Sequence, residues 1–174
     1  MATVIDYFNT LEGDACLRIN RLARSPWIRR SFSAVSKLGD GWFWGAMALT
    51  TLLIHGPGVM PKLVTVSVTT IAGIAIYKLL KAKLVRERPY INHHGIHCGT
   101  APLDRYSFPS GHTLHAVSFT TMFYVIEPLL LAVTLPFTIL VAASRVILGL
   151  HYPSDVVVGA AIGATLASIA SLSL

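Results

Sequence analysis

The stretch SRVILGLHYPSD, residues 144–155, lies between two long apolar segments and gives the first indication of how the chain is organised. It places Arg145, His151 and Asp155 at intervals of six and four residues. A guanidinium can clamp an anion, a histidine can attack or carry a proton, and a carboxylate can orient that histidine. An Arg at a helix end and an Asp that caps the next helix are also ordinary helix punctuation, so the stretch alone leaves both interpretations open.

The composition is that of a membrane protein. The chain has 174 residues, which fits one domain. Hydrophobic residues make up 53% and charged residues 13%, against about 25% charged residues in soluble domains, and the mean hydropathy is +0.62. The net charge of +6 and the pI near 9.6 favour anionic lipid or a phosphorylated substrate as partner, because the basic residues form no recognised nucleic-acid module.

Residues 1–40 are predicted to form two amphipathic helices at the membrane interface. They lack the roughly 18 to 20 apolar residues of a spanning helix, and their acidic side chains argue against a cleavable signal peptide. A helical hairpin packed on the bundle is the alternative. The apolar repeat runs through Val4, Phe8, Leu11, Ala15, Ile19 and Leu22, and then through Ile28, Phe32, Val35 and Leu38.

From residue 41 the pattern changes to apolar runs of membrane-spanning length. We expect five transmembrane helices at roughly 41–60, 62–80, 111–127, 129–148 and 155–174. Trp42 and Trp44 are either interface anchors or core residues. Gly159 and Gly163 give the last span a small-residue face, which favours packing within the chain over a dimer contact. The oligomeric state stays open.

One long polar loop, residues 85–109, separates the second predicted span from the third. If this loop lies on one membrane face, the third span leaves that face and the fourth returns to it. Residues 144–155 then lie beside the loop. Parity alone therefore predicts that the two polar clusters meet.

Three cations are expected at this face: Lys81 in the last turn of the second span, Arg88 in the loop, and Arg145. Together they can surround a tetrahedral oxyanion. Ser110 and Gly111, at the start of the third span, would direct free backbone N–H groups and a helix dipole at the same anion. Pro89, Pro109 and Ser144 are supporting neighbours of these groups.

Two histidines can divide a phosphoryl-transfer reaction between them. We assign His151 as the nucleophile that forms a phosphohistidine, Asp155 as the group that orients it, and His112 as the acid that protonates the leaving group. No metal or other cofactor is expected, because the cations neutralise the phosphate charge. Of the eight carboxylates only Asp155 lies within these motifs.

These residues also resemble a known family. Lys81 to Arg88-Pro89, Pro109-Ser110-Gly111-His112, and Ser144-Arg145 to His151 to Asp155 are similar to the three-part signature of the type 2 phosphatidic acid phosphatases, which are related to vanadium haloperoxidases. The resemblance covers roughly residues 40–174. It implies a helical bundle with a phosphate site at one membrane face, and the same residue roles. Many members have six spans, one more than we count.

The predicted organisation is therefore an amphipathic interfacial segment, 1–40, followed by a transmembrane phosphatase domain, 41–174. The expected activity is hydrolysis of the terminal phosphate of a membrane lipid, with undecaprenyl diphosphate, phosphatidate or phosphatidylglycerophosphate as candidate substrates. A vanadate-dependent haloperoxidase-like enzyme and a non-catalytic lipid-phosphate-binding protein are the alternatives. The resemblance points to a bacterial inner membrane with the site facing outward, whereas the positive-inside rule points to the cytoplasmic side.

Several further residues have two interpretations. His93, His94, His97 and Cys98 form HHGIHC, which we interpret as a loop that lines the substrate entrance rather than a transition-metal site. His115 follows His112 by three residues and is expected to be a packed neighbour or a supporting donor. Cys16 and Cys98 form neither a disulfide framework nor a thiolate metal site, and they could pair only on an oxidising face.

Overall fold

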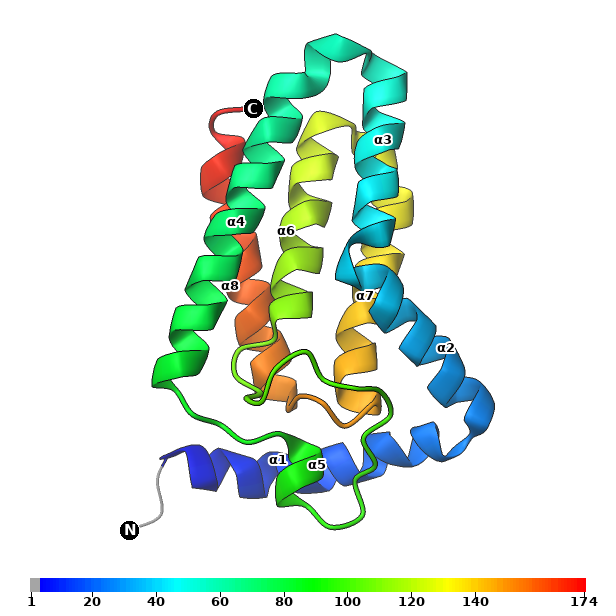
Figure 1. Cartoon of the computed structure of the whole chain (residues 1–174), viewed down its shortest axis with the longest axis vertical. Helices are drawn as coiled ribbons and strands as arrows, with labels where there is room; N and C mark the ends of the chain where they lie inside the picture. The colour runs from blue at the N-terminus through cyan, green and yellow to red at the C-terminus, as the bar shows by residue number, and fades with distance from the viewer. Residues whose placement is uncertain (1–3) are drawn as a thin grey trace.

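The protein is a bundle of helices (Figure 1). The computed structural model describes the backbone of residues 4–174 and side chains from residue 11 onward, and this part contains no strand. The predicted all-α class is confirmed. The side chains of Val4 and Phe8, which begin the predicted apolar repeat, lie outside the described residues. The helices are α1 (Val4–Asn20), α2 (Pro26–Lys37), α3 (Phe43–His55), α4 (Met60–Lys83), α5 (Pro89–Asn92), α6 (Gly111–Ile126), α7 (Leu131–Ile147) and α8 (Pro153–Ser171).

Three helical segments of the described chain are long and apolar enough to cross a membrane: Pro57–Lys83, Pro128–Ile147 and Pro153–Ser171. The other two bundle helices, α3 with 13 residues and α6 with 16, are shorter. At 1.5 Å per residue they measure about 20 and 24 Å, less than a hydrocarbon core of about 30 Å. Five membrane crossings therefore remain a prediction, although helices form in all five predicted runs.

Glycine and proline set the helix boundaries. Gly56 ends α3 with a φ of 68°, a left-handed conformation that glycine adopts without a steric penalty. A short turn at Pro57–Val59 follows, and α4 begins at Met60. The first predicted run, 41–60, therefore contains a helix end, and the second begins earlier than predicted. Helix α7 continues through its internal Pro136.

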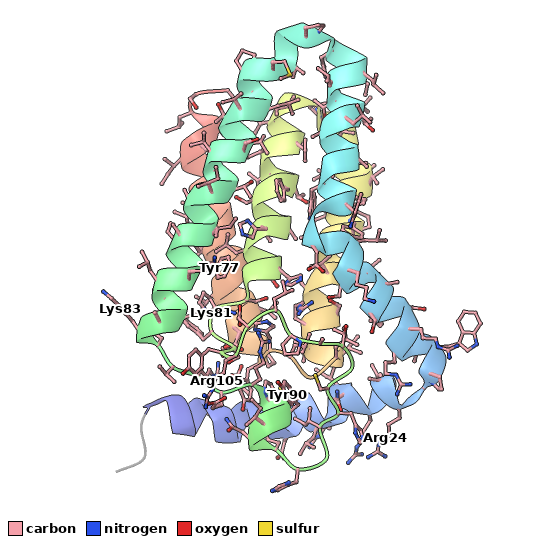
Figure 2. The ribbon with its side chains drawn as sticks, viewed as in Figure 1. Arg24, Tyr77, Lys81, Lys83, Tyr90 and Arg105 are labelled. Carbon is pink, nitrogen blue, oxygen red and sulfur yellow. The ribbon has the colours of Figure 1, made fainter. Side chains whose placement is uncertain are left out.

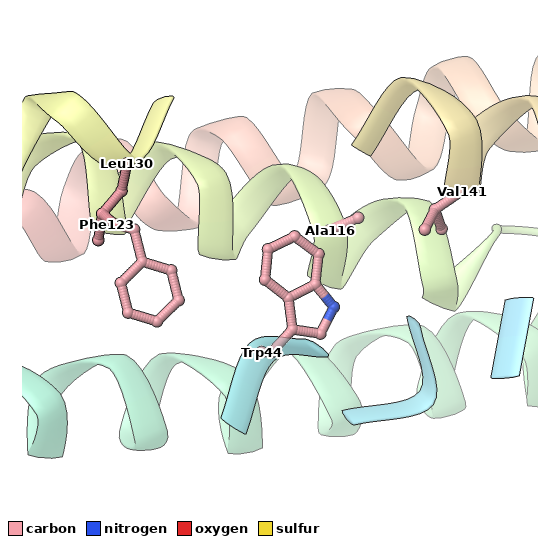
Figure 3. Packing of buried hydrophobic residues seen from close by; sticks show 5 residues of the cluster. All are labelled: Trp44, Ala116, Phe123, Leu130 and Val141. Atoms are coloured by element: carbon pink, nitrogen blue, oxygen red, sulfur yellow. The ribbon is translucent and has the colours of Figure 1, made fainter. Parts of the chain in front are cut away.

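An apolar core between α3, α6 and α7 holds the bundle together (Figure 3). Trp44 is 3% exposed, and its ring stacks on Phe119 with centroids 4.9 Å apart. For Trp44 the interface-anchor interpretation is therefore wrong and the core interpretation is right, because α2 and α3 fold back over α6 and α7. Trp42, two residues earlier, is 81% exposed. The core cluster consists of Trp44, Ala116, Phe123, Leu130 and Val141.

Helices α6 and α8 pack with almost no space between their backbones. A Cβ on Gly159 would lie 2.5 Å from the carbonyl oxygen of Ser110, and one on Gly163 would lie 2.2 Å from that of Leu114. The small-residue face predicted on the last span is thus used inside the chain. This contact fixes the start of α6 against the start of α8, where the candidate site lies.

Helix α1 lies across the lower end of the bundle, beside α5 and the loop that follows it (Figure 1). Asn20 is 2% exposed, and its side chain donates to the carbonyls of His97 and Ile147, both at 2.9 Å. It also accepts from the backbone N–H of His97 at 2.8 Å. The N-terminal segment is therefore packed on the bundle, as in the alternative interpretation, and its position relative to a membrane interface stays a prediction.

Candidate active site

A cavity of about 250 Å³ opens at the lower end of the bundle. Its lining on α4 runs from Thr70 to Lys81, which is about 16 Å at 1.5 Å per residue. Figure 2 shows Tyr77 and Lys81 on the inner side of α4, whereas Lys83 points away from the bundle. The charged or titratable side chains that line the cavity are Asp40, Tyr77, Lys81, Arg88, Asp104, His112, His115, Arg145 and His151.

The three predicted cations all line this cavity and all are buried. Lys81 Nζ donates to both carboxylate oxygens of Asp104, at 2.7 and 2.8 Å. Arg88 donates from Nη2 to Asp104 Oδ1 at 2.8 Å, and from Nη1 to the carbonyl of Leu150 at 2.8 Å. Arg145 Nε is buried without a hydrogen-bond partner. Lys81 and Arg88 are thus held in place by hydrogen bonds, whereas Arg145 keeps one buried donor without a partner.

Asp104 was not among the predicted site residues, yet its carboxylate accepts hydrogen bonds from two of the three cations, Lys81 and Arg88. Burial raises the pKa of its carboxyl group, but hydrogen bonds and charges from Lys81 and Arg88 outweigh burial and hold this pKa below the usual value. Asp104 is therefore ionised and occupies donors that would otherwise bind an anionic ligand. Asp155 is the only carboxylate within the three motifs, and Asp104 joins the cavity from outside them.

His151 lies between a cation and a carboxylate. Its Nε2 is 3.3 Å from Arg88 Nη1, and its Nδ1 is 3.5 Å from Asp155 Oδ2. Because a guanidinium can only donate, this geometry favours a lone pair on Nε2 and a proton on Nδ1. Burial, together with the charges of Arg88 and Arg145, holds the pKa of His151 well below 6.5. The ring is therefore a neutral imidazole whose unprotonated nitrogen is a possible nucleophile.

Arg86 compensates the buried carboxylate of Asp155, a role that the sequence motifs do not indicate. Arg86 Nη1 donates to Asp155 Oδ1 at 2.6 Å, and the backbone N–H of Tyr152 donates to Oδ2 at 2.9 Å. The Arg86 guanidinium also lies 4.0 Å from the centre of the Tyr152 ring and 2.8 Å from Glu12 Oε2. Asp155 is fully buried, so an unpaired charge there would be costly.

His112, the second histidine, is on the first turn of α6 and lines the cavity. Its Nε2 lies 2.5 Å from Oδ1 of Asp40, a residue of the short kinked segment Leu38–Trp42 that joins α2 to α3. This hydrogen bond, more than any other interaction, lowers the pKa of Asp40. The acid candidate is thus paired with a carboxylate that no sequence motif marked.

Not every predicted site residue reaches the cavity. Gly111 lines it, but the Ser110 hydroxyl caps α6 by accepting from the backbone N–H of Thr113 at 3.4 Å. The Ser144 hydroxyl donates to the carbonyl of Val141 within its own helix. Pro89 and Pro109 are buried, and neither lines the cavity. The structure therefore brings together Lys81, Arg88, Gly111, His112, Arg145 and His151, with Asp155 behind His151.

The sequence pattern of the PAP2 superfamily matches residues 62–173, well over half of the chain. The chain belongs to the PAP2 superfamily. The match begins in α4 and includes the three motifs, whereas Asp40 and the rest of the N-terminal segment lie outside it.

Curated relatives of this PAP2 protein are named phosphatases. It is 37% identical to decaprenylphosphoryl-5-phosphoribose phosphatase of Mycobacterium tuberculosis over 97 aligned residues. These residues make up 55% of this chain and 51% of that protein. Over 100 residues it is 33% identical to lipid A 1-phosphatase of Rhizobium johnstonii, 55% of this chain and 41% of that protein. The chain spans about half the length of the curated relatives it matches.

Solved structures show the same PAP2 fold. Aquifex aeolicus LpxE aligns with a TM-score of 0.78 and 28% identity over 94% of this chain and 96% of that one. A transmembrane PAP2 type phosphatidylglycerolphosphate phosphatase from Bacillus subtilis aligns with a TM-score of 0.65 and 21% identity, covering 97% and 93% of the two chains. The PAP2 protein is thus an integral membrane protein of this fold.

The loop with HHGIHC does not line the cavity, contrary to expectation. The Asn20 side chain hydrogen-bonds the backbone of this loop at His97 and holds the loop against α1. The ring of His93 packs on Tyr152 with centroids 6.0 Å apart. Among the described residues of this PAP2 protein, no group of three or more His, Cys, Asp or Glu side chains could hold a metal ion. Cys16 and Cys98 are both free thiols.

Proposed function

We propose that the protein is a lipid phosphatase that removes a terminal phosphate from a membrane lipid through a phosphohistidine on His151, without a metal ion. The observation that carries this proposal is the position of His151, whose ring lies between Arg88 and Asp155 at the wall of a cavity that also holds Lys81, Arg145 and His112. A site that only binds phosphate needs the cations but not two histidines.

In the first step, the phosphate binds among Lys81, Arg88 and Arg145, which stabilise the charge of the transition state. Nε2 of His151 attacks phosphorus, and the bond from phosphorus to the lipid oxygen breaks. His112 gives its proton to that oxygen, so the lipid leaves as an alcohol, or as a monophosphate if the substrate is a diphosphate. Asp155 stabilises the positive charge that develops on the His151 ring.

In the second step, water attacks the phosphorus of the phosphohistidine. His112, now unprotonated, takes a proton from this water as the bond from phosphorus to His151 Nε2 breaks. Inorganic phosphate leaves, and both histidines return to their initial protonation states. All proton transfers are made by side chains of this chain.

The lining of the cavity and the relatives support a set of candidate lipids. Trp44, Ile74, Leu103 and Phe119 give the cavity apolar lining beside the charged groups, which fits a lipid with its phosphate at the polar end. Undecaprenyl diphosphate, phosphatidate and phosphatidylglycerophosphate remain candidates. The names of the curated relatives add two more classes: phosphorylated glycolipids of the lipid A type and polyprenyl phosphosugars.

The test is release of inorganic phosphate from each of these lipids by the purified protein in mixed micelles with EDTA. We expect turnover of at least one lipid, and loss of most activity in His151→Ala and His112→Ala. His55→Ala is the matched control, since His55 pairs with Glu127 at the opposite end of the bundle. Retained turnover in both site variants would refute the proposed roles.

We propose further that the site faces outward from a bacterial inner membrane. Thirteen of the 14 Lys and Arg residues, all but Lys62, lie at the site end of the chain by the predicted topology, which by the positive-inside rule opposes this orientation. Family resemblance supports it. A cysteine placed at the exposed Ser31 of a Cys-free variant should react with an impermeant thiol reagent in intact cells. If this cysteine reacts only after the cells are lysed, the site faces the cytoplasm and the proposed orientation is wrong.

A further inference from the structure

Two polar contacts join the N-terminal segment to the site from outside the family match. Asp40 Oδ1 lies 2.5 Å from His112 Nε2, and Ser36 Oγ accepts from Arg145 Nη1 at 2.5 Å. Ser36 and Asp40 are four residues apart and both face the bundle. The site of the proposed phosphatase therefore includes side chains that the three motifs do not contain.

The backbone between these residues is shaped to bring Asp40 to the cavity. The segment Leu38–Trp42 is a kink between α2 and α3, with non-helical backbone angles at Gly41. Gly41 has a φ of 144°, which favours glycine. Gly39 lies against α7, since a Cβ there would be 3.2 Å from Val141. Gly39, Asp40 and Gly41 all line the cavity.

We propose that Asp40 is a positioning residue for His112: its carboxylate binds Nε2, holds a proton on that nitrogen and leaves Nδ1 to exchange a proton with the reacting oxygen. This inference rests on the proposed function, because it assigns a task to the same acid. The hydrogen bond fixes the rotation of the imidazole, and the negative charge stabilises the imidazolium that donates the proton.

The charge environment of His112 makes this carboxylate important. Burial, and after it the charges of Arg145 and Lys81, disfavour the protonated form of His112, whereas Asp40 supplies a negative charge in hydrogen-bond contact with it. The charged and titratable groups around His112 come from each neighbouring element: Asp40 from the kink between α2 and α3, Lys81 from α4, His115 from α6, Arg145 from α7 and His151 from the turn before α8.

The experiment replaces the charge and keeps the shape, with Asp40→Asn in the full-length protein. In the proton-coupled ¹³C NMR titration of labelled histidine, the midpoint of His112 should move to lower pH by about one unit or more. The His112 signal is assigned by its loss in His112→Asn. An unchanged midpoint would overturn the proposal. Asp40→Glu should restore the midpoint in part, and Asp14→Asn, an exposed change on α1, should leave it unchanged.

Kinetics supply a second readout. In Asp40→Asn we expect kcat to fall about 10- to 100-fold with little change in KM, because a general acid contributes about 10² to 10⁴. In the dependence of kcat on pH, the limb that reports the ionisation of His112 should move to lower pH, as the NMR midpoint does. A fall in KM and kcat without a shift of this limb would indicate a structural role only and overturn the proposal.

The two readouts also separate this inference from the proposed function. If wild-type protein releases no phosphate from any lipid, the proposed function fails, yet the NMR midpoint still decides whether Asp40 controls His112. If phosphate release depends on His151 and His112 but Asp40→Asn behaves as wild type in both readouts, only the inference fails. The thermal unfolding midpoint of each variant shows whether the fold is retained.

Discussion

Asp104 binds two of the cations to which the substrate phosphate would bind. Its carboxylate receives hydrogen bonds from Lys81 and Arg88 at 2.7 to 2.8 Å. An anion that enters the cavity must compete with this carboxylate or push it aside. Asp104 therefore weakens anion binding while it keeps the cations in position.

The variant Asp104→Asn should bind phosphate analogues more tightly. We expect the inhibition constant of orthovanadate to fall about tenfold, which corresponds to about 1.4 kcal/mol, because the competing charge is removed. Inhibition of phosphate release at several lipid concentrations measures it. Glu127→Gln, at the opposite end of the bundle, is the control and should be unchanged. An unchanged or weaker inhibition in Asp104→Asn would show that the carboxylate does not compete.

His151 makes the stability of the protein depend on pH. Its pKa in the folded state is well below the value near 6.5 that an unfolded histidine has, so below about pH 6.5 only the unfolded state takes up this proton. We expect the free energy of unfolding to fall between pH 6.5 and pH 5, by at most about 1.4 kcal/mol per unit from this residue.

The check is thermal unfolding across this pH range for wild type and for His151→Asn, in which the dependence should be weaker. His94→Asn, a change at an exposed position, should keep the wild-type dependence. A wild-type slope in His151→Asn would mean that the His151 ring is protonated in the folded state.

The site residues that sequence reasoning found and those that it missed differ in one physical respect. Lys81, Arg88, His112, Arg145 and His151 lie in motifs with fixed spacing, and helix parity brings those motifs to one end of the bundle. The missed groups, Asp40, Asp104, Arg86 and Glu12, compensate the charges of the others, and a compensating charge can come from any segment that packs nearby. Packing between distant segments decides which one does.

At the scale of the helices, the contact between α6 and α8 sets the distance between the two histidines. His112 is the second residue of α6, and His151 lies two residues before α8. Gly159 and Gly163 let the backbones meet at carbonyl oxygens of α6. A change of spacing here moves the acid relative to the nucleophile, although neither glycine touches the cavity.

The variant Gly163→Ala should therefore lose both stability and activity. A Cβ at 2.2 Å from the carbonyl oxygen of Leu114 forces the helices apart, and such overpacking costs about 1 to 3 kcal/mol. Thermal unfolding and kcat measure the two effects. Gly45→Ala in α3, where a Cβ meets no atom within 4 Å, is the matched control and should be neutral or slightly stabilising. Equal behaviour of the two variants would contradict this account.

Helix boundaries were less predictable than helix existence. Hydropathy located all five bundle helices, because each has a long apolar run. It did not locate the end of α3, since Gly56 ends this helix inside a predicted apolar run, whereas the end of α6 at Ile126 lies one residue from the predicted end. Hydropathy also could not distinguish a tryptophan in the core from one at an interface, and Trp44 and Trp42 have opposite environments.

At the scale of the whole molecule, α1 closes the lower end of the bundle through polar contacts. Glu12 accepts from the backbone N–H and the hydroxyl of Ser154, at 2.7 and 2.6 Å, and from Arg86. Asn20 binds the loop after α5 and the end of α7. The N-terminal helix thus holds together the segments that carry Arg86, Arg145 and Asp155.

The variant Asn20→Ala should lower the free energy of unfolding by about 2 to 4 kcal/mol, because it removes buried hydrogen bonds to three backbone groups and leaves them unpaired. Denaturant or thermal unfolding in detergent measures the loss. Thr65→Ala on α4, whose hydroxyl bonds only its own helix at an exposed position, is the control and should change little. A loss no larger than that of the control would mean that α1 is not part of the cooperative fold.

The cavity that joins charged groups to an apolar wall has a consequence for the direction of the proposed reaction. Inorganic phosphate dissolves in water, and the remaining lipid returns to the bilayer, so the two products partition into different phases as soon as they leave. Resynthesis would require both to return to one small cavity at once, and bulk phosphate is dilute. In the proposed reaction, hydrolysis would therefore continue even while the lipid product accumulates around the protein.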